Sequence, residues 1–87
     1  MEQGLIIARE IAQSENKVLE YFLIARPHLD GFYYSIAVMS AGLGGKFCQV
    51  DKVTGNEARA RGYYNRLLNG AVRPENLAEV LYEMIVR

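Results

Sequence analysis

The chain has 87 residues, of which ten are basic, ten are acidic and about half are hydrophobic. A chain of this length forms at most one domain with a modest core. Its balanced charge gives no general attraction to nucleic acids or anionic membranes, so such binding needs a local patch. The first residues lack the positive charge of a secretory signal, and the longest apolar run, residues 32–43, is too short to span a membrane. We therefore expect a cytoplasmic protein.

The first predicted element covers residues 5–13. Its apolar residues fit either a β-strand or an amphipathic turn of helix. We favour a strand, because residues 14–17 have the composition of a turn that leads directly into the next apolar run.

A hairpin is predicted around Asp30-Gly31. This pair lies between alternating apolar runs over residues 18–26 and 32–40, and both of its residues tolerate the positive φ of a tight turn. The glycine-rich residues 42–45 mark another turn, and a further strand is expected over residues 46–53.

The second half of the chain has the pattern of two helices. Thr54 and Glu57 have the spacing of a capping box, followed by apolar residues at helical spacing. Gly70 is expected to end this helix in the left-handed conformation. Pro74 suits the first turn of a second amphipathic helix.

Strands followed by helices indicate a single small α+β domain over residues 1–87. We expect an antiparallel meander of three to four strands, followed by two C-terminal helices that pack on one sheet face. The single cysteine, Cys48, cannot form an internal disulfide, which agrees with a reducing compartment.

The register of the hairpin decides which side chains face the helices. A two-residue Asp30-Gly31 loop pairs Leu29 with Phe32. It gives both strands a nearly continuous apolar core face, which comprises Leu19, Tyr21, Leu23, Ala25, Phe32, Tyr34, Ile36 and Val38.

Pro27 argues against this register, because it would lie opposite Tyr34 at a hydrogen-bonded position without an N–H to donate. A three-residue loop would place Pro27 at a position where no N–H is needed, but it would direct Phe22 and Ile24 into the core. We favour the two-residue loop, because one lost hydrogen bond costs about 1 kcal/mol and exposing several large apolar side chains costs more.

The order of elements resembles a known family. A strand around residues 34–38, a helix that opens after residues 53–54 and a last helix that opens at residues 73–77 resemble short uncharacterised proteins from Gram-positive bacteria. The resemblance covers residues 18–85. It implies a strand meander followed by two helices, and it implies no activity, because none is assigned to that family.

Three features approach a chemical site without completing one. Residues 42–46 resemble a phosphate-binding loop, but Ser40 replaces its first glycine and a strand follows it instead of a helix. His28 is the only histidine, and Cys48 is more typical of packing than of catalysis. A pairing of these two residues in space stays open. We expect no catalytic residues, no metal ligands and no cofactor.

The main functional hypothesis is a non-enzymatic protein-binding module, such as a regulatory adaptor or a phage or mobile-element inhibitor of a host system. We expect Phe22, Ile24, Tyr33 and Met39 to form an apolar patch on the sheet face that the helices leave uncovered. The patch would bind an unidentified protein partner, or it would be covered by the N-terminal segment or by a second copy of the chain.

The alternative hypothesis is nucleic-acid binding by the first helix. Arg59, Arg61 and Arg66 would contact phosphates, and Tyr64 would stack on a base. A helix-turn-helix is disfavoured, because the polar face of the second helix carries glutamates that would repel phosphates.

Overall fold

The computed structural model describes residues 4–42 and 44–86. Its four-stranded antiparallel sheet has the order β1-β2-β3-β4. The strands are β1 (Leu5–Ser14), β2 (Lys17–His28), β3 (Gly31–Ser40) and β4 (Phe47–Thr54). They are followed by α1 (Glu57–Asn69), the single 3₁₀ turn η1 (Pro74–Asn76) and α2 (Leu77–Val86). The predicted α+β class is confirmed, and residues 5–13 belong to a strand.

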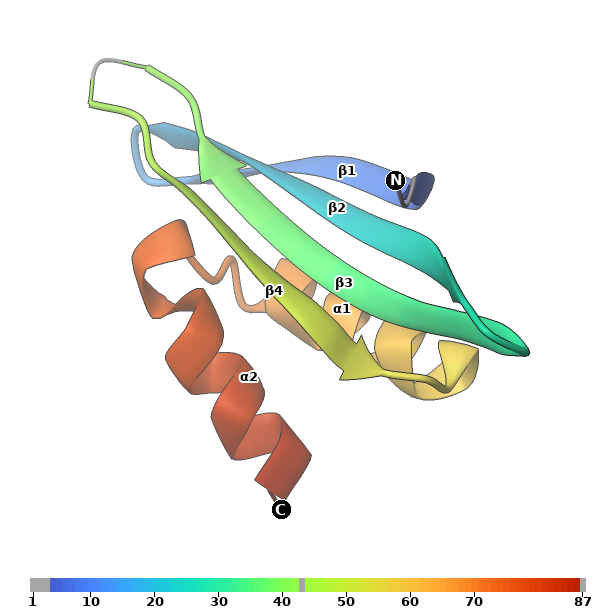
Figure 1. The fold of residues 1–87 in the computed structure, drawn as a ribbon. Helices are drawn as coiled ribbons and strands as arrows, with labels where there is room; N and C mark the ends of the chain where they lie inside the picture. The colour runs from blue at the N-terminus through green and yellow to red at the C-terminus, as the bar shows by residue number, and fades with distance from the viewer. Residues whose placement is uncertain (1–3, 43, 87) are drawn as a thin grey trace.

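Both helices pack against the same face of the sheet (Figure 1). The core between the two layers consists of alternate residues of the central strands together with residues of both helices, mainly Leu19, Tyr21, Leu23, Ile36, Val38, Tyr64, Leu67, Leu77 and Leu81. The Tyr21 hydroxyl donates a hydrogen bond to the Val72 carbonyl at 2.8 Å, which ties the sheet to the connection between the helices. Within the described residues, no helix is long and apolar enough to cross a membrane.

The β2–β3 hairpin has a register that differs from both expected ones. His28 pairs with Gly31 and Pro27 pairs with Phe32, so the loop consists of Leu29 and Asp30. Relative to the favoured prediction, the strands are displaced by two residues. The predicted pairing of Leu29 with Phe32 is wrong, and Phe32 is half exposed instead of buried in the core.

A displacement by two residues keeps the same residues on each face, so the predicted core face of β2 is confirmed. It also resolves the conflict over Pro27. His28 and Gly31 form the hydrogen-bonded pair that closes the hairpin. The next pair, Pro27 and Phe32, is therefore a non-hydrogen-bonded pair, and it requires no N–H from Pro27. The displacement places Leu29 in the left-handed region, with φ of 45°.

The pairing of β4 with β3 is interrupted by a bulge. Tyr34 pairs with Thr54 and Ile36 pairs with Val50, so three residues of β4 lie opposite Ser35. Lys52 in this bulge has φ of 53°. The extra residues turn Val53 toward the core, where it is 8% exposed.

Both ends of α1 differ from the prediction. The N-cap is Asn56, whose Oδ1 accepts a hydrogen bond from the Arg59 backbone N–H at 2.9 Å, so the expected capping box of Thr54 and Glu57 is wrong. At the other end, Gly70 has a right-handed φ of −87° and Ala71 has φ of 50°. Ala71 therefore occupies the left-handed position of a Schellman motif.

The glycine-rich turn before β4 was also predicted. Gly42 and Gly44 have φ of 108° and 74°, values that favour glycine. Leu43, which the prediction places in the same turn, lies outside the described residues, as do residues 1–3 and 87.

Replacing Ala71 by glycine is expected to stabilise the protein by about 1 kcal/mol, because it removes the Cβ that disfavours the left-handed conformation. Ala78→Gly is the matched control, since the same change inside α2 should destabilise the protein by about 1 kcal/mol. Denaturant unfolding measures both. A loss of stability in Ala71→Gly would contradict the assignment of the cap.

Leu29→Asn tests the observed turn. Leu29 is 93% exposed and makes little contact, so the substitution relieves the positive φ at almost no packing cost and should add about 1 kcal/mol of stability. Gly31→Ala should be tolerated, because Gly31 is outside the left-handed region and a Cβ there meets no atom within 4 Å. A two-residue Asp30-Gly31 loop would give the opposite pair of results.

Candidate functional site

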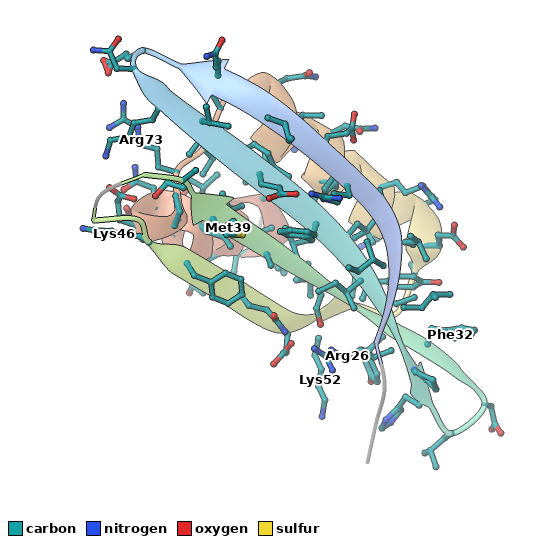
Figure 2. All side chains as sticks on the ribbon, turned by 90° about the horizontal axis from the view of Figure 1, so that it is seen from above. Arg26, Phe32, Met39, Lys46, Lys52 and Arg73 are labelled. Atoms are coloured by element: carbon teal, nitrogen blue, oxygen red, sulfur yellow. The ribbon has the colours of Figure 1, made fainter. Side chains whose placement is uncertain are left out.

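The sheet face opposite the helices is called the outer face here, and Figure 2 shows it from above. The strand registers place the following residues on it: Ile6, Arg9, Ile11, Gln13, Val18, Glu20, Phe22, Ile24, Arg26, Tyr33, Ser35, Ala37, Met39, Phe47, Gln49 and Asp51. No helix of the described chain packs on this face (Figure 1).

The four residues predicted to bind a partner all lie on the outer face. Phe22 lies opposite Ala37, Ile24 lies opposite Ser35, and Met39 lies opposite both Glu20 and Phe47. The predicted side chains are each half-buried. They therefore form part of a cross-strand layer on the sheet instead of projecting freely into solvent.

The prediction missed the apolar residues contributed by the two edge strands. Ile6 and Ile11 of β1 are 54% and 63% exposed, and Phe47 of β4 is 60% exposed. The alternation within residues 5–13 was a signal for Ile11, but using it required the pairing of β1 with β2. These residues extend the apolar surface across the whole width of the sheet.

Small residues form the floor of the outer face. Ala37 is 2% exposed although no helix covers it, and it lies between Phe22 and Gln49 on the neighbouring strands. Ser35 is fully buried between Ile24 and the β4 bulge. Larger neighbours therefore shield the backbone of β3.

Four charged side chains on the outer face form two ion pairs. Arg9 forms an ion pair with Glu20, and its guanidinium lies 6.0 Å from the centre of the Phe22 ring. Arg26 Nε lies 3.7 Å from Asp51 Oδ1. These two ion pairs balance each other, and Lys52 adds one positive charge at the hairpin end of the face.

Asp51 is the centre of a polar cluster at the bulge. Its Oδ1 accepts hydrogen bonds from Gln49 Nε2 at 2.7 Å and from the Ser35 hydroxyl at 3.0 Å. The hydrogen bond from Gln49, followed by that from Ser35, lowers the pKa of the Asp51 carboxyl below its ordinary value, and the charge of Arg26 lowers it further. Asp51 is thus held as a carboxylate.

A shallow pocket lies beside this cluster, at the hairpin end of the outer face. It has a volume of about 150 Å³ and is lined by Arg26, Pro27, His28, Tyr33, Asp51 and Lys52. The His28 and Tyr33 rings contact each other in a T-shaped arrangement with their centres 4.7 Å apart, and Lys52 Nζ lies 5.9 Å from the Tyr33 ring centre. Arg26 and Lys52 are neighbours in Figure 2. Typical ligand pockets are at least about 300 Å³, so this one suits a single side chain better than a cofactor.

The open pairing of His28 with Cys48 is excluded. His28 lies opposite Gly31 at one end of β3, and Cys48 lies opposite Val38 near the other end. Seven residues of extended strand separate these positions by roughly 20 Å. Among the described residues, no group of three or more His, Cys, Asp or Glu side chains could hold a metal ion.

On the surface predicted to bind nucleic acid, the residue expected to stack on a base is buried. Tyr64 is 2% exposed, and its hydroxyl donates a hydrogen bond to the Tyr21 carbonyl at 3.3 Å. The prediction that Tyr64 stacks on a base is therefore wrong, because this ring packs between helix and sheet. Arg61 is engaged by Glu57 at 2.9 Å, Arg66 lines a groove against α2, and Arg59 is exposed.

Replacing Asp51 by asparagine should change how stability depends on pH. A lowered folded-state pKa stabilises the protein above the unfolded value of about 3.9, and this contribution is lost as pH falls through the folded-state value. Near neutral pH the free energy of unfolding of the wild type should exceed that of Asp51→Asn by less than about 1 kcal/mol, since the carboxylate is largely exposed. Urea unfolding between neutral pH and pH about 2 should show this difference disappearing. Ser35→Ala should reproduce part of it, and parallel profiles would contradict the cluster.

Comparison of the chain with protein-family models, with curated proteins and with solved structures returns no match. The resemblance to short Gram-positive proteins therefore stays a prediction. The functional argument below rests on the outer face itself: its apolar side chains, its paired charges and the absence of a covering helix among the described elements.

Proposed function

We propose that this protein is a small protein-binding module that uses the outer face. The observation that carries the proposal is one uncovered sheet face with large apolar side chains on all four strands, among them Ile11, Phe22, Met39 and Phe47. Contiguous apolar surface of this kind on a small domain usually marks a contact with another macromolecule. Covering it removes apolar area from water, at about 25 cal/mol per Å².

The charge pattern supports a protein as the occupant. The Arg9–Glu20 and Arg26–Asp51 pairs are internal to the face, so they attract neither a polyanion nor a polycation. An apolar centre with polar groups around it is the usual anatomy of a protein–protein interface. Phe22 and Ile24 lie on a central strand and would form the middle of the contact.

Our proposal places the protein among cytoplasmic regulatory adaptors or phage- and mobile-element-encoded inhibitors of host systems. Both act by occupying a surface on another protein, and neither requires catalysis or a cofactor. Nucleic-acid binding is the weaker alternative, because the burial of Tyr64 removes the residue that would have stacked on bases.

The double variant Phe22→Asp, Ile24→Asp tests the proposal. It places two carboxylates in the centre of the apolar surface and should lower affinity for a captured protein partner at least tenfold, or about 1.4 kcal/mol. Affinity purification followed by a binding titration measures the loss, and circular dichroism checks that the variant is folded.

Tyr82→Asp is the matched control. Tyr82 is 64% exposed on α2, on the helical side of the molecule, so the same type of change there should leave binding intact. Undiminished binding by the folded double variant, or an equal loss in Tyr82→Asp, would overturn the outer face as the binding surface.

A further inference from the structure

Strand β1 is an edge strand whose outer backbone edge has no partner among the described residues. Its pairing with β2 is interrupted once, between Ile6 and Ala8, and is then regular over residues 8–14. The helices pack chiefly against β2, β3 and β4. A regular run of unpaired N–H and C=O groups is a template for an additional strand.

The opposite edge of the sheet has a different character. Strand β4 contains the bulge around Lys52, and both η1 and α2 pack against it. Bulges and covering elements are the devices that prevent a sheet edge from pairing with another chain. Of the two edges, only β1 presents a regular segment together with an exposed apolar side chain at its centre, Ile11.

We propose that two copies of this chain associate through their β1 edges. The strands pair antiparallel about a two-fold axis, and Ile11 lies opposite Ile11 of the second copy. Residues 8–14 of one copy then pair with residues 14–8 of the other, so that the two four-stranded sheets form one continuous sheet. This association does not depend on the protein-binding role of the outer face.

Symmetry and charge select this register. A two-fold axis perpendicular to the sheet keeps both outer faces on one side, and it centres the pairing on one residue that lies opposite its own symmetry mate. Centring the pairing on Arg9 or Glu10 would place like charges directly opposite each other, which is destabilising. Centring it on Ile11 uses the whole regular segment and places Arg9 opposite Gln13 and Glu10 opposite Ala12.

The continuity of the outer face supports a second copy as the occupant. Ile11 is on the outer face and 63% exposed, and pairing with its symmetry mate would cover part of it. The face would then run without a break across both copies. Self-association of an edge strand in this way is an isologous contact, which closes at two subunits and leaves no free β1 edge.

Site-directed cross-linking tests the register. In a Cys48→Ser background, Ile11→Cys should be converted to a covalent dimer by a short bis-maleimide, because opposite residues of paired strands lie within about 5.5 Å. Ile6→Cys is the matched control on the same strand and face. In the proposed register its two copies are about 30 Å apart, so it should stay monomeric. Cross-linking of Ile6→Cys, or none of Ile11→Cys, would overturn the register.

Light scattering after size exclusion tests the association itself. Wild type at high micromolar concentration should have twice the mass of the 9.8 kDa chain. Ile11→Lys, which brings two lysines together, should shift it to the monomer, whereas Ile6→Lys should not. Phe47→Asp should remain dimeric, because Phe47 lies on β4, at the opposite edge of the sheet. A monomeric wild type, a dimeric Ile11→Lys or a monomeric, folded Phe47→Asp would refute edge pairing.

Discussion

The pairing of β2 with β3 is the constraint on which the rest of the structure depends. It places Tyr21 opposite Val38 and Leu23 opposite Ile36, and these four side chains face the helices and are fully buried. A slip by one residue would exchange the faces of β2 and expose several of them, at about 1.5–3 kcal/mol for each large apolar side chain. The same constraint directs Phe22 and Ile24 outward, so the core and the candidate binding surface are two consequences of one register.

The pattern of the sequence determines the faces of these strands but not their displacement. Registers that differ by two residues place the same side chains on each face, so alternation alone cannot separate them. The local preference of Asp30-Gly31 favoured one of them, whereas the chain adopts another that frees Pro27 from a hydrogen-bonded position. The positive φ of Leu29 is the local cost of that arrangement.

Errors at the ends of α1 have a similar origin. Asn56 and Thr54 are both good N-caps, and the choice between them depends on where β4 ends after its bulge. Gly70 and Ala71 are neighbouring positions of the Schellman motif, and the preference of glycine for the left-handed conformation favours Gly70. The position of the motif also depends on a tertiary contact, because the Val72 carbonyl after it accepts a hydrogen bond from the Tyr21 hydroxyl. The prediction missed the edge-strand residues of the outer face. The face on which their side chains lie depends on how β1 and β4 pair and where they bulge, and not on the alternation of apolar residues within each strand.

The irregular backbone of this fold lies outside residues 8–14 of β1. Of the described non-glycine residues with positive φ, Leu29 and Lys52 lie at the pocket end of the outer face, Ala71 connects the helices, and Glu15 lies in the turn that follows β1. The bulge on β4 positions Asp51 to pair with Arg26 and to accept a hydrogen bond from the buried Ser35. It thereby provides partners for the Asp51 carboxylate within the chain. The backbone N–H and C=O groups on the outer edge of β1 have no such partners among the described residues, so the two edges of the same sheet differ in how far the chain itself covers them.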